Sequence, residues 1–207
     1  MNRKRDITIG LLFISAFPLY GVGSSLLETA PSSESSSFFH AAAGIGLLLV
    51  LSNSAVVLVI GRMLNKIVAP IDKAAAVIYF YARLVEALLL AFSASLIFHS
   101  HHHFAAGEIN GGGSSPIAPW CYRVAMLGLG MGSFPLLISM MKAKAIPAWL
   151  GWSGMVGYSC VIVGILADSV GAKDLGLLFM IPGAFFEITF AIWLIFRGFQ
   201  FDGYESL

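Results

Sequence analysis

Long apolar stretches alternate with short polar connectors along the whole chain. A helix that crosses a bilayer needs about 20 mostly apolar residues to span a hydrocarbon core roughly 30 Å thick. Strands of a membrane barrel would alternate polar and apolar residues, and these stretches do not. Six stretches meet the helical requirement: residues 7–27, 38–60, 74–98, 120–141, 149–167 and 176–196. The pattern predicts an all-α integral membrane protein, a bundle of six transmembrane helices.

The bundle is predicted to occupy residues 7–196, between an N-terminal segment (1–6) and a C-terminal tail (197–207). Two alternatives remain open. The first helix could be a cleaved signal peptide, because MNRKRD is a basic start, although the apolar run is long and Pro31 after Ala30 makes a poor cleavage site. The two sets of three helices could form an inverted repeat, as in many transporters. Residue-level similarity between the halves is not visible.

Basic residues are distributed unequally over the connectors and tails. An excess of Lys and Arg marks the cytoplasmic side of a membrane protein. One side carries only Lys173. The other side carries nine basic residues: Arg3, Lys4, Arg5, Arg62, Lys66, Lys73, Lys142, Lys144 and Arg197. This asymmetry predicts that both termini are cytoplasmic.

The composition agrees with this picture and excludes other classes. Of the 207 residues, 58 % are hydrophobic and 11 % are charged, and the mean hydropathy is +0.86. A soluble domain usually has about 25 % charged residues. The net charge is +1, so no basic field favours nucleic acid. The expected surroundings are a lipid bilayer, with other membrane proteins or further copies of the chain as candidate partners.

Four charged residues lie inside the predicted helices. Arg83 and Glu86 belong to the third helix, Arg123 to the fourth and Glu187 to the sixth. Each charge at the centre of a membrane costs about 2.5–3.5 kcal/mol on insertion scales, so these side chains should face protein and find partners. Tyr79 shares the face of Arg83 and Glu86, because residues three or four apart lie on one side of a helix.

Helix rise suggests which of these charges meet. At about 1.5 Å per residue, Arg83 and Glu187 each lie roughly 14 Å from the cytoplasmic edge. Glu86 lies about 12 Å and Arg123 about 5 Å from the outer edge of a ~30 Å core. We therefore predict the pairs Arg83–Glu187 and Glu86–Arg123. Such pairs could fix helix register, or they could form a relay or substrate site.

Other polar positions have simpler interpretations. Asn53 lies mid-helix between two serines and is expected to hydrogen-bond between helices. Pro18, Pro135 and Pro182 lie inside three helices and should kink them.

A histidine run follows the third helix on the predicted outer side. His101, His102 and His103 are weak candidates for a Zn²⁺, Cu²⁺ or Ni²⁺ site, since imidazole ligates these ions. The glycine-rich residues that follow would not hold a fixed geometry. A solvated loop is the simpler interpretation, so no cofactor is predicted.

Three segments carry a resemblance to a known family. They are IPAWLGWSGMVGY and IPGAFFEITFAIWLIFRGF, together with AAAVIYFYARLVEALLL in the third helix. The chain resembles, over residues 7–200, the bacterial membrane family catalogued as domain of unknown function 4386. The resemblance implies a six-helix protein of the bacterial inner (cytoplasmic) membrane. It also matches Arg83, Glu86 and Glu187 to the family's R-x-x-E and P-G-x-x-x-E pattern, and it implies no activity.

Three functional classes remain open. The short connectors favour a non-catalytic helix bundle, such as an accessory subunit of a membrane complex. The alternative is a transporter or proton-coupled carrier that uses Arg83, Glu86 and Glu187. An intramembrane enzyme is less favoured, because the chain lacks G-x-S-x-G, H-E-x-x-H, phosphate-loop and C-x-x-C motifs.

Overall fold

The computed structural model describes residues 3–28, 37–105, 115 and 117–200. These residues form six α-helices, and each predicted apolar stretch lies within one of them. All six are long and apolar enough to cross a membrane, which confirms the predicted fold class. The helices are α1 (Arg3–Glu28), α2 (Ser37–Val68), α3 (Lys73–Ala105), α4 (Ala118–Lys142), α5 (Ala148–Ser169) and α6 (Lys173–Phe196).

Two helices continue well beyond their apolar stretches. α3 was expected to end near residue 98 but continues to Ala105. α2 was expected to end near residue 60 but continues to Val68. Its last two turns are amphipathic, since Leu64 and Ile67 are buried while Arg62 and Lys66 are exposed. An apolar face of this kind keeps a helix packed after its hydropathy falls. The average hydropathy of a stretch therefore underestimates helix length at the ends.

The start of α3 is fixed by a side-chain cap. Asp72 accepts a hydrogen bond from the backbone N–H of Ala75 at 3.0 Å, as an N-cap residue does. Ser139, near the end of α4, donates its hydroxyl to the same carboxylate at 2.6 Å. The bonds from Ser139 and Ala75 lower the pKa of Asp72. The cap therefore also ties α4 to α3.

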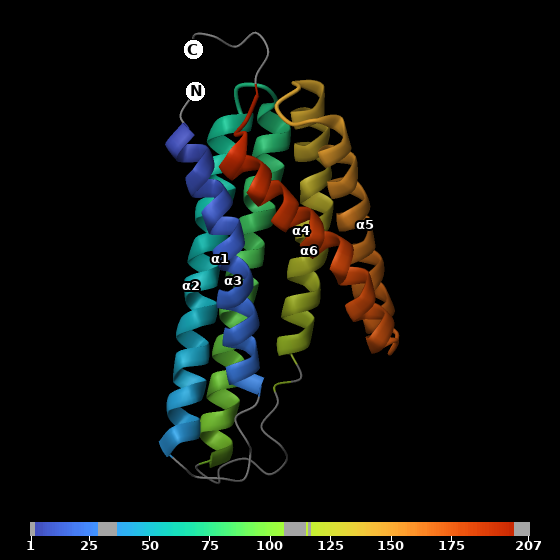
Figure 1. The fold of residues 1–207 in the computed structure, drawn as a ribbon. Coiled ribbons are helices and arrows are strands. Elements are labelled where there is room, and N and C mark those ends of the chain that lie inside the picture. The colour runs from blue at the N-terminus through green and yellow to red at the C-terminus, as the bar shows by residue number, and fades with distance from the viewer. Residues whose placement is uncertain (1–2, 29–36, 106–114, 116, 201–207) are drawn as a thin grey trace.

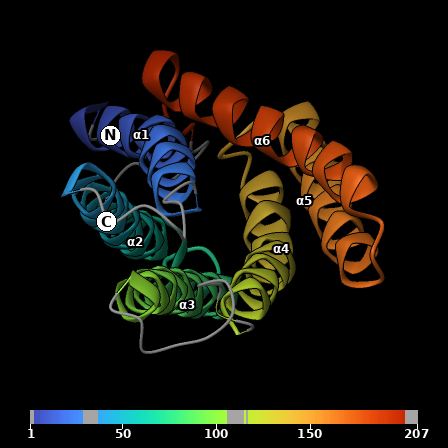
Figure 2. The same ribbon diagram turned by 90° about the horizontal axis from the view of Figure 1, so that it is seen from below.

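The helices form a closed ring in chain order. Each helix packs against the next one, and α6 returns to α1 (Figure 2). The start of α1 and the end of α6 lie at the same end of the bundle, which we call the terminal end (Figure 1). The connectors between α2 and α3 and between α4 and α5 lie at this end too.

Polar contacts close the ring between α1 and α6 at the terminal end. Arg3 donates to the carbonyl oxygens of Ile195 and Phe196, which end α6. Asp6 is fully buried and accepts the backbone N–H of Phe199 at 3.2 Å. From the hydropathy pattern, Asp6 was expected in an N-terminal segment and Phe199 in a tail. In the structure both residues belong to the packed bundle.

Candidate functional site

α3 places three polar side chains on the face that points into the bundle. Tyr79, Arg83 and Glu86 are four and three residues apart, so they project from one side of the helix. The Nε of Arg83 donates to the Tyr79 hydroxyl at 2.7 Å, and Nη1 donates to Glu86 Oε2 at 2.9 Å. The side chains of Arg83 and Glu86 are 3 % and 5 % exposed. The polar stripe predicted from the sequence is thus a buried ion pair with a phenol beside it.

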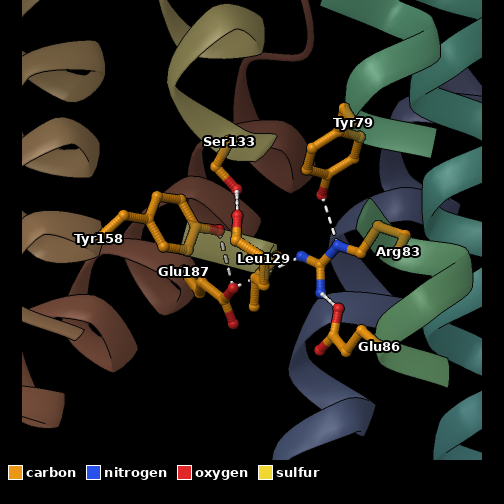
Figure 3. Close-up of polar contacts among 7 residues, drawn as sticks. All are labelled: Tyr79, Arg83, Glu86, Leu129, Ser133, Tyr158 and Glu187. Carbon is orange, nitrogen blue, oxygen red and sulfur yellow. Dashed lines mark hydrogen bonds and ion pairs between the residues drawn. The ribbon is translucent and has the colours of Figure 1, made fainter. Parts of the chain in front are cut away.

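α6 brings a second carboxylate to the same guanidinium (Figure 3). The Nη2 of Arg83 lies 3.5 Å from Glu187 Oε1, which confirms the contact predicted from equal depth. Tyr158 of α5 donates its hydroxyl to that oxygen at 2.9 Å. The Glu187 side chain keeps 18 % exposure, so it remains partly accessible. We call Tyr79, Arg83, Glu86, Tyr158 and Glu187 the Arg83 cluster.

Packing around Arg83 fixes the position of its guanidinium. The Cζ atom lies 5.4 Å from the ring centre of Phe13 on α1 and 5.3 Å from that of Tyr79. Cations within about 6 Å of an aromatic ring centre are attracted to its face. On the α2 side, a Cβ atom added to Gly61 would lie 2.7 Å from the Cβ of Arg83. Only a residue without a side chain leaves room for the arginine stem there.

Tyr158 is the member of the cluster that sequence reasoning missed. A tyrosine does not interrupt an apolar stretch, so hydropathy gave no signal. A comparison of depths in the membrane would have indicated this contact. Tyr158 lies ten residues after the start of α5, and Glu187 lies nine residues before the end of α6, so both are at a similar distance from the terminal end. Close helix packing completes the contact, since a Cβ added to Gly157 would lie 3.0 Å from the carbonyl oxygen of Pro182.

A small cavity adjoins the Arg83 cluster. It is about 10 Å³ in volume, close to the least that holds one water molecule. Its lining is largely aromatic and aliphatic, and its polar groups are the phenols of Tyr79 and Tyr158 and the hydroxyl of Ser133. Ser133 donates to the backbone carbonyl of Leu129 at 2.7 Å (Figure 3). The cluster therefore borders a space that fits a water molecule but no organic substrate.

The predicted pairing of Arg123 with Glu86 is wrong. The Nε of Arg123 donates to Asp168 Oδ2 at 2.8 Å, and its guanidinium lies 4.7 Å from the ring centre of Trp120. Arg123 thus joins α4 to the end of α5 and lies outside the Arg83 cluster. The fifth apolar stretch was predicted to end at residue 167, which left Asp168 in a connector, whereas α5 continues through Ser169.

The remaining candidates do not join the cluster. Asn53 on α2 is buried, and its Oδ1 has no hydrogen-bond partner within the described residues. The interhelical bond expected for this oxygen is therefore not found. The side chains of His101, His102 and His103 lie outside the described part of the chain, so metal binding there stays a prediction.

Comparison with known proteins gives one match. A family model described as Domain of unknown function (DUF4386) matches residues 8–198. No curated protein and no solved structure matches the chain. The matched residues include every helix that contributes to the Arg83 cluster.

Proposed function

The chain belongs to the family described as Domain of unknown function (DUF4386), and from this premise we propose that it is a non-catalytic helix bundle of the bacterial cytoplasmic membrane. In this proposal it acts as an accessory or stabilising subunit of a membrane complex. It would bind its partner subunits through the outer surface of the bundle. The Arg83 cluster holds the helices in register.

The observation that carries the proposal is the close packing around Arg83 within the described residues. Each of the three guanidinium nitrogens of Arg83 contacts an oxygen atom of the cluster. The adjoining cavity of about 10 Å³ is far below the ~300–1,000 Å³ of typical small-molecule sites. A buried arginine that is bonded in this way serves packing and register without any ligand.

The outer surface supports a role in association. Large apolar side chains are exposed all around the ring, among them Leu48 on α2, Leu88 on α3, Val156 on α5 and Phe185 on α6. Such side chains are stable only against lipid tails or other membrane helices. Partner subunits or further copies of the chain could therefore pack on any of these faces.

Photo-cross-linking tests the association. A photoreactive residue at Leu88 or Phe185, both more than half exposed, is expected to give a discrete protein adduct in native membranes. The same residue at Leu137, which is buried, serves as the control and should give none. Adducts with lipid alone from both exposed positions would contradict the proposal.

A second candidate function is a proton-coupled carrier, and the partial exposure of Glu187 favours it. Liposomes that contain the protein and a trapped pH-sensitive dye separate the two functions. The accessory role predicts the same proton leak with and without the protein under an imposed pH gradient. A faster flux in the wild type that disappears in Glu187→Gln would favour the carrier.

The asymmetry of basic residues predicts that the terminal end is cytoplasmic. In a background with Cys121→Ala and Cys160→Ala, a cysteine at Val170 should react with an impermeant thiol reagent in intact cells. Cysteines at Pro70 and Ala148 should react only after the membrane is opened. All three positions are exposed, so access to the reagent and not burial decides the result. Labelling of Pro70→Cys in intact cells would show that the terminal end faces outward and would contradict this prediction.

A further inference from the structure

The Arg83 cluster contains more acid than base. Glu86 and Glu187 both approach the one guanidinium of Arg83, at 2.9 and 3.5 Å. With both carboxylates ionised, the cluster would carry one uncompensated negative charge. A carboxylate that lacks its own counter-ion inside a membrane is costly, and two carboxylates that share one site resist ionising together.

Among the described residues, Arg83 is the cation that forms ion pairs with the two acids. Tyr20 of α1 and Tyr122 of α4 lie close enough to interact electrostatically with Glu86, and Tyr158 of α5 contacts Glu187. The phenol groups of these tyrosines are neutral hydrogen-bond donors, so they do not balance the negative charge of a carboxylate. On α2, Arg62 and Lys66 are exposed near the terminal end and are not among the charges that act on Glu86. Within the described residues, Arg83 is thus the one cation of the cluster.

The geometry of the acids permits a shared charge. Figure 3 shows the carboxyl groups of Glu86 and Glu187 at two different terminal nitrogens of the guanidinium. Arg83 contacts one oxygen of each acid, and Tyr158 contacts the same Glu187 oxygen that Arg83 does. A second oxygen on each acid can therefore carry a proton without breaking these contacts. Glu187 is the more exposed of the two acids, at 18 % against 5 % for Glu86.

We infer that Glu86 and Glu187 together bind one proton at neutral pH, which makes the Arg83 cluster a proton-binding site. This inference goes beyond the proposed function, since neither an accessory role nor a carrier is needed for it. One shared proton leaves one carboxylate to balance Arg83. The proton belongs to the pair of acids, as in coupled titrations, and not to either residue alone.

Infrared spectroscopy of the membrane-reconstituted protein tests the inference. The wild type is expected to show the C=O stretch of a protonated carboxyl group at neutral pH, shifted by ²H₂O and by ¹³C-labelled glutamate. Glu86→Gln and Glu187→Gln should each lose the band, because the remaining acid then ionises against Arg83. Glu28→Gln, at an exposed end of α1, serves as the control and should keep it.

The outcomes of this experiment are distinct. A wild type without the band, or a band that survives in both cluster variants, overturns the inference. If neither cluster variant folds, the labelled wild type still decides whether a protonated glutamate is present.

Thermal unfolding gives a second readout. Each single glutamine variant should melt close to the wild type, since one acid still balances Arg83. The double variant should melt far lower, because it leaves the guanidinium without an anion. Two single losses that simply add would contradict a shared proton. The liposome flux and the cross-linking test the proposed function, whereas the infrared band and the melting temperatures test the proton site. Either proposal can therefore be contradicted while the other stands.

Discussion

Replacing Arg83 with leucine is expected to lower the free energy of unfolding by about 3–5 kcal/mol, the usual cost of breaking a buried ion pair from one side. The change removes a hydrogen-bond donor from Tyr79 and the counter-charge from Glu86 and Glu187. Glu86 would then remain buried, and Glu187 partly buried, without a cation. Reversible unfolding in detergent or in lipid measures the loss.

Arg123→Leu is the matched control for this experiment. It removes the same type of side chain from an ion pair whose partner, Asp168, is 27 % exposed. Pairs near the surface contribute about 1 kcal/mol or less, so the control should lose far less stability. Equal losses in the two variants would mean that burial of the Arg83 cluster has no energetic consequence.

A double-mutant cycle then asks whether Arg83 and Glu187 stabilise each other. Glu187→Leu alone removes one acid, and the double variant with Arg83→Leu leaves neither of these two charges in the bundle. We expect the double variant to recover much of the stability that Arg83→Leu loses, since the remaining acid can bind a proton. If the two single losses simply add, the 3.5 Å contact contributes nothing to folding.

The helices and the Arg83–Glu187 contact could be predicted because both depend on position along the membrane normal. Hydropathy locates a segment in the membrane, and helix rise gives the depth of each residue in it. Two opposite charges at equal depth on facing helices are then expected to form an ion pair. The match of depth was sufficient for this pair because α3 and α6 both present their charges to the centre of the ring.

Depth alone was not sufficient for Arg123. The fourth helix lies between α3 and α5 in the ring, so a residue at a given depth can face either neighbour. Arg123 faces α5 and contacts Asp168. The direction in which a side chain points around its helix depends on the packing of the whole ring, which a single sequence does not give.

The contacts at the terminal end were missed for another reason. Arg3 and Asp6 precede the apolar stretch of α1, and Phe199 follows that of α6. Hydropathy assigns such residues to the water phase. The structure instead uses them for capping, as Arg3 contacts the last carbonyl groups of α6 and Asp6 contacts the N–H of Phe199. Cations are favoured at a helix C-terminus, so this arrangement stabilises the end of α6.

Gly198 is the point where the chain turns from α6 into these contacts. It has a φ of +73°, which a residue with a side chain rarely adopts. A Cβ atom placed on it would lie 2.7 Å from Asp6 Oδ2 and 3.2 Å from Arg3 Nη1. Gly171, between α5 and α6, also has a positive φ, of +93°, but a Cβ atom there would meet nothing within 4 Å.

The two glycines allow backbone strain to be separated from the contact with Asp6. Gly171→Ala should cost only the strain of a left-handed alanine, about 1–2 kcal/mol. Gly198→Ala should cost the same strain plus about 1–3 kcal/mol, because the added methyl group displaces the buried Asp6 carboxylate from the N–H of Phe199. Unfolding of both variants in the same detergent measures the difference. Equal losses would show that the buried contact between Asp6 and Phe199 does not hold α6 against α1.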